Sequence, residues 1–125
     1  MPGLTLDAGA LIAFERNDRQ VVGLLAQALT HGLTITVPAG VVGQVWRDGR
    51  RQARLARLLG APDVVVEPLV DERAREAGQL CGVRGTTDVI DASVVLTARR
   101  RGDRIASSDE LDLVHLDPTA RIIRV

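Results

Sequence analysis

The sequence has 125 residues, of which 46% are apolar, and its 16 basic and 16 acidic residues give a formal net charge of zero at pH 7. Only Phe14 and Trp46 are aromatic, so we expect one domain with an aliphatic core. The neutral balance excludes a global field that attracts polyanions. Every basic residue is arginine, which excludes a P-loop lysine and Schiff-base chemistry.

The single cysteine, Cys81, excludes an internal disulfide and a thiolate metal cluster within one chain. We expect it to pack as a small hydrophobe. The sequence shows no secretory leader and no apolar stretch near the roughly 18 residues that a membrane helix needs. These features predict a soluble protein in the cytoplasm, with no membrane contact.

The first half of the chain alternates short apolar strands with helices. Asp7 and Asp18 stand where side chains cap helix starts, and Pro38 suits the first position of a helix. The predicted elements are a strand at 3–6, a helix at 8–15, a helix from Asp18 through Leu29, a strand at 33–37, a helix from Pro38 through Trp46, and a helix at 50–59 that ends at Gly60.

The second half continues the same alternation. The predicted elements are a strand at 64–69, a helix at 71–80, a loop at 82–85, a largely buried helix at 88–101, a strand at 104–108, a short helical turn at 110–113 and an edge strand at 121–125. Short apolar strands that alternate with helices are typical of a parallel sheet covered on both faces. The sequence therefore predicts an α/β fold.

Four aspartates stand at strand exits or helix starts. Asp7 follows the first strand and Asp109 follows the fourth, while Asp88 and Asp91 open the buried helix and share one face of it. Ligands of parallel sheets gather beyond the carboxyl ends of the strands, so we expect the four carboxylates to converge there. Taken singly, each of the four could instead serve as a helix cap or interact with a helix dipole.

Carboxylates that lie this close raise one another's pKa unless a cation compensates their charge. Oxygen-only ligands favour Mg²⁺ or Mn²⁺, and the sequence offers no cluster of His or Cys for zinc. The chemistry that fits is phosphodiester hydrolysis by metal-activated water.

Three stretches carry a resemblance to a known family. They are TLDAGALIA, VPAGVVGQVWRDG and DVIDASVVLTARRRGDRIASSDELDL, and in this order they span essentially the whole chain. The sequence resembles the PIN domain, and more narrowly the VapC-type toxin ribonucleases of bacterial toxin–antitoxin pairs. The resemblance implies a single PIN-like domain over residues 1–125, with a three-layer α/β/α architecture and a mostly parallel sheet of four to five strands.

Carried over by position, Asp7, Asp91 and Asp109 match the family's metal-binding acids, and Asp88 matches an extra acid of one subset. Ser107 matches a hydroxyl that orders the last motif. The resemblance further implies an RNA substrate, a cognate antitoxin and a homodimer. We therefore expect a Mg²⁺- or Mn²⁺-dependent endoribonuclease.

Two positions depart from the family pattern. Gln44 stands where the family places Glu, and Gly9 stands where Asn, Ser or Thr is common. An amide keeps an oxygen acceptor but removes a negative charge. Asp88 or Glu15 could supply that charge. If neither does, the alternative is a degenerate PIN-like module that binds RNA or a protein without cutting.

Arginines between residues 47 and 57 form the densest basic run. Arg47, Arg50 and Arg54 are candidate contacts for RNA phosphates or an acidic partner, and a solvated helix face is the competing interpretation. Arg50 and Arg54 are expected on one face of the 50–59 helix. A receiver or phosphatase domain also uses Asp at a strand end, but the first needs a lysine and the second needs Asp where Gly9 stands.

Overall fold

The structure is a computed structural model that describes residues 2–125. Within this range five parallel strands form one sheet in the order β3-β2-β1-β4-β5. The strands are β1 (Leu4–Leu6), β2 (Ile35–Pro38), β3 (Val64–Glu67), β4 (Arg104–Ser107) and β5 (Ile122–Arg124). The central strand β1 is buried along its whole length, as both-face coverage requires.

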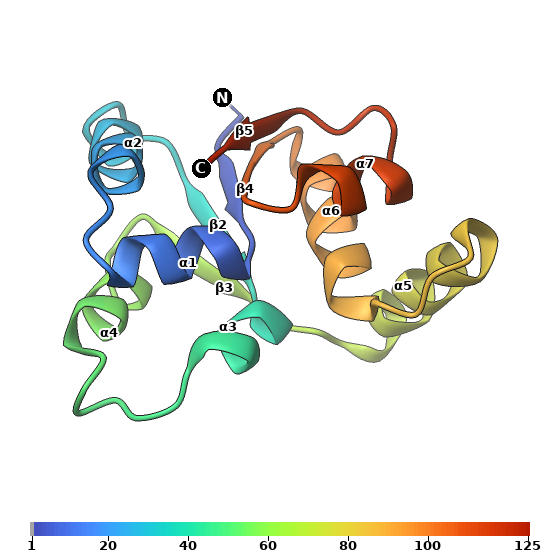
Figure 1. Cartoon of the computed structure of the whole chain (residues 1–125), viewed down its shortest axis with the longest axis horizontal. Helices are drawn as coiled ribbons and strands as arrows, with labels where there is room; N and C mark the ends of the chain where they lie inside the picture. The colour runs from blue at the N-terminus through green and yellow to red at the C-terminus, as the bar shows by residue number, and fades with distance from the viewer. Residues whose placement is uncertain (1) are drawn as a thin grey trace.

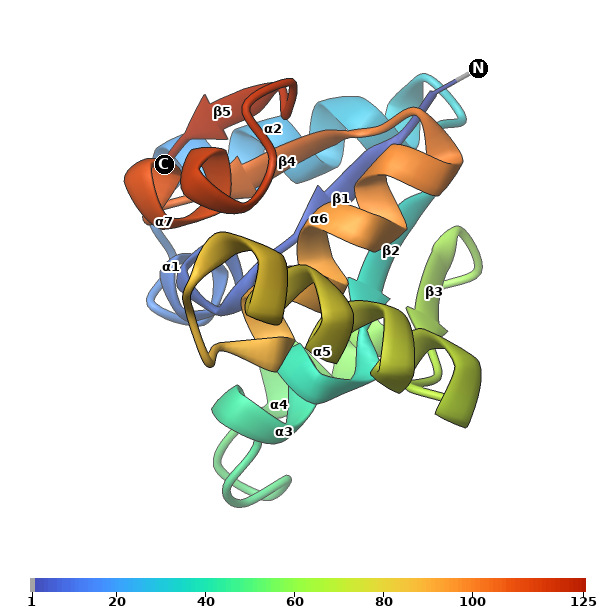
Figure 2. The ribbon, with the colours of Figure 1, turned by 90° about the vertical axis from the view of Figure 1, so that its right-hand side faces the viewer.

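Helices cover both faces of this sheet, so the three-layer α/β/α prediction is confirmed. The helices in residues 2–125 are α1 (Ala8–Glu15), α2 (Arg19–Thr30), α3 (Ala39–Val45), α4 (Ala53–Leu59), α5 (Asp71–Arg84), α6 (Val89–Arg101) and α7 (Glu110–Leu116). Figure 1 shows α1, α2 and α4 on one side of the strands and α5, α6 and α7 on the other. Figure 2 shows α6 lying along the strands, with α5 packed beside it.

Several predicted features agree closely with the structure. The helix at 8–15 has the predicted bounds, and Asp18 caps α2 by accepting a hydrogen bond from the Val21 backbone N–H at 3.1 Å. Helix α6 buries six of its residues and ends at Gly102, which has a φ of 71°. Cys81 is buried as a packed side chain. No helix in the described range is long and apolar enough to cross a membrane.

The predicted helix at 50–59 is wrong at its start, because α4 begins only at Ala53. The buried Gln52 side chain holds the preceding loop instead. Its Oε1 accepts from the Arg47 and Asp48 backbone N–H groups at 2.7 and 2.9 Å, and its Nε2 donates to the Val45 carbonyl at 2.9 Å. Arg50 therefore lies in a loop and shares no helix face with Arg54.

The predicted helix from Pro38 through Trp46 is shorter than expected. Pro38 ends β2 in extended conformation, and Trp46 leaves the helix with a ψ of 129°. Trp46 is 38% exposed, so it is not a core residue.

The predicted loop at 82–85 is wrong, because α5 continues to Arg84 and stops at Gly85, whose φ of 71° suits a residue without a side chain. The predicted turn at 110–113 extends to Leu116, since Leu113 and Leu116 bury one shared face. Strand β3 ends before Pro68, which lacks an N–H for pairing. The other boundaries differ by one or two residues.

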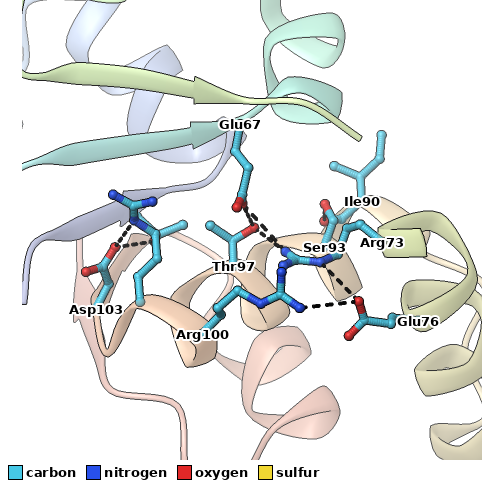
Figure 3. A network of polar contacts seen from close by, with 10 residues as sticks. Glu67, Arg73, Glu76, Ile90, Ser93, Thr97, Arg100 and Asp103 are labelled. Atoms are coloured by element: carbon cyan, nitrogen blue, oxygen red, sulfur yellow. Dashed lines mark hydrogen bonds and ion pairs between the residues drawn. The ribbon is translucent and has the colours of Figure 1, made fainter. Parts of the chain in front are cut away.

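A polar network fastens α6 to α5 and β3 (Figure 3). The buried Arg73 of α5 donates from Nη1 to Thr97 Oγ1 of α6 at 2.7 Å and lies 3.6 Å from Glu67 Oε2 of β3. The Thr97 hydroxyl also donates to Glu67. Glu76 Oε1 forms ion pairs with Arg73 Nε at 3.8 Å and with Arg100 Nη2 at 3.7 Å. The helix that carries Asp91 is thus fixed against its neighbours by more than apolar packing.

Candidate active site

The strand order places a topological switch between β1 and β4. These neighbouring strands lead to helices on opposite faces of the sheet, since α1 follows β1 and α7 follows β4 (Figure 1). A crevice opens at such a point beyond the carboxyl ends of the strands, where α/β proteins bind their ligands. Asp7 directly follows β1, and Ser107 ends β4.

Asp7 is only 3% exposed and serves two purposes at once. Its Oδ1 accepts a hydrogen bond from the Ala10 backbone N–H at 3.0 Å and caps α1. Its Oδ2 accepts from the Ser107 hydroxyl at 2.5 Å. Burial raises the pKa of Asp7 above its usual range, while the bonds from Ser107 and Ala10 partly oppose this effect.

Ser107 links the segment that carries Asp7 to the segment that carries Asp109. Besides donating to Asp7, its Oγ accepts from the Asp109 backbone N–H at 2.8 Å. One buried hydroxyl therefore fixes both the first carboxylate and the backbone that carries the last one.

Asp88 and Asp91 stand at the start of α6. Asp88 caps the helix, since its Oδ1 accepts from the Asp91 backbone N–H at 2.9 Å. Asp91 is half-buried, and its pKa is raised to about 7. Burial is the largest cause, followed by the charge of Asp88, the hydrogen bond with Asp88, and the charges of Asp109 and Asp7.

The charges of Asp7, Asp88 and Asp109 all act on Asp91, and we call these four residues the acidic rim. Among residues 2–125 no three His, Cys, Asp or Glu side chains are already posed as a ready-made metal site. The donor chemistry nevertheless fits a hard divalent cation, because the rim offers only carboxylate oxygens and the negative charges of its other members act on Asp91.

Gln44 and Glu15 lie together in a different place, beside a groove of about 590 Å³ between α1 and α3. Glu15 accepts from Gln52 Nε2 at 3.1 and 3.3 Å, so its carboxylate is engaged there. Asp7, Asp88 and Asp109 are the charges that act on Asp91, and Glu15 is not among them. Of the two carboxylates that could compensate for Gln44, Asp88 acts on Asp91 and Glu15 does not.

The three candidate arginines do not form one surface. Arg47 lines the same groove as Gln44 and donates to the carbonyls of Trp46 and Gly43. Arg50 is almost fully exposed in the loop before α4. Arg54 donates to Asn17 Oδ1 at 2.6 Å and lies over the Phe14 ring.

Two residues of this region were not found by sequence reasoning. Gln52 organises the loop next to the groove, and nothing in its sequence context marks it. Ser108 packs against Gly9 at the crevice, although only its neighbour Ser107 belongs to a recognisable motif.

Solved structures share this architecture. A chain of the VapBC2 complex from Rickettsia felis, bound to a DNA fragment from its promoter, has a TM-score of 0.69 at 13% identity and covers 97% of both chains. The Mycobacterium tuberculosis toxin VapC20, which cleaves the sarcin–ricin loop, has a TM-score of 0.63 at 16% identity and covers 88% of this chain and 94% of its own.

A chain of FitAcB from Neisseria gonorrhoeae has a TM-score of 0.61 at 16% identity and covers 96% of both chains. No model of a protein family matches the sequence, and no curated protein matches it. At these identities the likeness establishes the fold, which is the PIN-like fold that the sequence motifs implied.

Proposed function

We propose that this chain is a divalent-metal-dependent endoribonuclease of the VapC type, the toxin of a toxin–antitoxin pair. The acidic rim at the β1–β4 switch carries the proposal, because the charges of Asp7, Asp88 and Asp109, which come from three distant parts of the sequence, act on Asp91. The shared fold with VapC20, a toxin that cleaves the sarcin–ricin loop, supports it.

Asp7, Asp91 and Asp109 would hold Mg²⁺ or Mn²⁺, with Asp88 assisting. The bound cation would supply a water nucleophile at neutral pH and would neutralise charge that develops on the phosphodiester. The protein's own contribution is to hold these carboxylates in place. Ser107 orients Asp7 and the Asp109 backbone, and Asp88 orients the first turn of α6.

Asp91 can also bind and release a proton near neutral pH. With a pKa of about 7, its carboxyl group is about half protonated at neutral pH when no cation is present. A nearby positive charge favours the ionised form. Cation binding is therefore expected to release a proton from the rim.

The partners are proposed by the same reasoning. The neighbours VapBC2 and FitAcB are antitoxin complexes, as is FitAB, whose fold matches with a TM-score of 0.65 at 13% identity. These complexes support an antitoxin for this chain as well. The groove lined by Ile12, Gln44 and Arg47 is a candidate binding site for an antitoxin segment. We further propose that Arg50 and Arg54 contact RNA and that the protein forms a homodimer.

Replacement of Asp91 by Asn tests the function. We expect RNA cleavage to fall by about 100-fold or more, since a charged ligand is lost, while the fold persists. Cleavage of a mixed RNA substrate in Mn²⁺ and circular dichroism of the same samples provide the two measurements. Asp112→Asn changes an exposed aspartate on α7 and should retain full activity. Full activity in Asp91→Asn would refute the proposal.

The second candidate function is a PIN-like module that binds without cutting. The position of Glu15 favours it, because Gln52 engages that carboxylate and Gln44 brings no charge. Calorimetry with Mn²⁺ separates the two functions: no heat of binding at millimolar Mn²⁺ favours the inert module. Activity that appears only in Gln44→Glu would point the same way.

A further inference from the structure

The two histidines of the chain both lie against a backbone carbonyl, but only one of these contacts joins different helices. His31 Nδ1 lies 2.8 Å from the Gln27 carbonyl oxygen, at the end of its own helix α2. His115 Nε2, in the last turn of α7, lies 2.7 Å from the carbonyl oxygen of Arg84, the last residue of α5. A carbonyl oxygen only accepts hydrogen bonds, so His115 Nε2 carries a proton and donates it.

This hydrogen bond satisfies a carbonyl at the end of α5. The last carbonyls of a helix have no partner within the helix and need one from elsewhere. The Cys81 carbonyl finds its partner locally, since the Thr86 backbone N–H donates to it at 3.1 Å. The Arg84 carbonyl finds its partner on another helix, which is His115. The bond therefore ties the C-terminal end of α5 to the last turn of α7.

Both tied helices lead to members of the acidic rim. Asp109 is the N-cap residue of α7, and Asp88 follows the last residue of α5 by four positions and caps α6. The last turn of α5 also lies close to the rim. Burial raises the pKa of the Cys81 thiol in that turn, and the charges of Asp88 and Asp91 raise it further.

We infer that His115 is a positioning residue, which holds the helix that begins at Asp109 against the loop that leads into α6. Asp88 and Asp91 stand at the end of that loop, so the bond sets their position relative to Asp109. Ser107 ties Asp109 to Asp7 in the same way. The consequence for cation binding rests on the proposed function, whereas the tie between the helices does not.

Two variants of His115 test the role, because they differ in whether they can donate an N–H. The Gln amide can donate to the Arg84 carbonyl, and the Leu side chain has no donor. We expect His115→Leu to bind Mn²⁺ about fivefold more weakly, and His115→Gln to stay within about twofold of the wild type. Calorimetry measures the affinities. Equally weak binding in both variants, or wild-type affinity in His115→Leu, would overturn the positioning role.

His31→Leu is the matched control. It also removes an exposed imidazole that lies against a carbonyl, but that contact stays within α2. Its Mn²⁺ affinity should remain within about twofold of the wild type. Urea denaturation of each variant separates positioning from a purely structural role. A lower stability of His115→Leu with unchanged Mn²⁺ affinity would show that the bond is structural only.

Hydrogen exchange tests the tie without metal. The Thr86 N–H, which bonds to the Cys81 carbonyl, should exchange about threefold faster in His115→Leu than in His115→Gln, because the end of α5 is released. His31→Leu should exchange at the wild-type rate. Equal rates in all variants would overturn the tie. If the wild-type protein binds no Mn²⁺, the proposed function fails while the exchange rates still test the tie, so the two failures are distinguishable.

Discussion

Ser107 connects two carboxylate-bearing segments that lie 100 residues apart in sequence. It donates to Asp7 and accepts from the Asp109 backbone, so one side chain sets the positions of both. Hydrogen bonds to charged groups contribute more than neutral ones, and buried partners left unpaired are costly.

We predict that Ser107→Ala lowers the free energy of unfolding by about 2 kcal/mol, because Asp7 and the Asp109 N–H lose their shared partner. RNA cleavage should fall by about tenfold or more. Urea denaturation and a cleavage assay on the same preparation measure both effects. Ser107→Thr keeps the hydroxyl and is the matched control. Unchanged stability and activity in Ser107→Ala would show that the bridge has no role.

The structural roles of some residues could be predicted from the sequence, whereas those of others could not. The caps at Asp7, Asp18 and Asp88 follow from local rules, because a cap bonds to an N–H two or three residues away. The contact between Gly9 and Ser108 joins positions 99 residues apart, and no local pattern announces it. The raised pKa of Asp91 could be foreseen as a direction, while its half-burial could not.

At the scale of elements, the start of α4 and the end of α5 were predicted wrongly from the sequence. Helix α4 starts late because Gln52 uses all its hydrogen-bonding groups on a loop and on Glu15, which hydrophobic periodicity does not report. Helix α5 runs past Gly82 because a helical glycine with open space around it is tolerated.

We predict that Arg73→Ala destabilises the protein by about 3 kcal/mol, because it leaves Glu67, Glu76 and Thr97 without their buried partner. The start of α6 should then shift, so Mn²⁺ affinity should fall as well. Urea denaturation and calorimetry measure the two losses. Arg75→Ala breaks an exposed pair with Asp71 and should change stability by less than about 0.5 kcal/mol. Equal effects of the two variants would contradict a special role for Arg73.

For the whole molecule, the acidic rim makes stability depend on pH. The folded pKa of Asp91, about 7, is higher than its ordinary value of 3.8, so the folded state binds this proton more tightly than the unfolded chain. The free energy of unfolding must therefore fall as pH rises between these values. Asp7, whose pKa is also raised, acts in the same direction.

We predict that the thermal unfolding midpoint of the metal-free protein decreases from pH 5 to pH 8, and that millimolar Mn²⁺ removes most of this decrease by stabilising the ionised carboxylates. Differential scanning calorimetry in chelator and in Mn²⁺ measures it. Asp91→Asn should flatten the metal-free profile, whereas Asp112→Asn should keep its slope. A metal-free midpoint that rises over this interval would be incompatible with the raised pKa.

The fold class and layer order could be predicted from the sequence because buried strands and amphipathic helices alternate regularly along the chain. The strand order could not, since periodicity does not say which strands become neighbours. The convergence of Asp7 with Asp109 depends on that order, because β1 and β4 pair directly although about 100 residues separate them. The convergence was expected without the strand order, from the rule that ligands of parallel sheets gather beyond the carboxyl ends of the strands.

The central position of β1 has a consequence for synthesis. A ribosome makes this strand first, yet one of its two neighbours, β4, lies in the last quarter of the chain. Asp103, just before β4, also binds the Gly3 backbone and the Thr5 hydroxyl. A nascent chain therefore carries an incomplete sheet, without Asp109 of the acidic rim, until residues 104–109 have been made. The acidic rim can therefore assemble only after β4 has been made and has paired with β1.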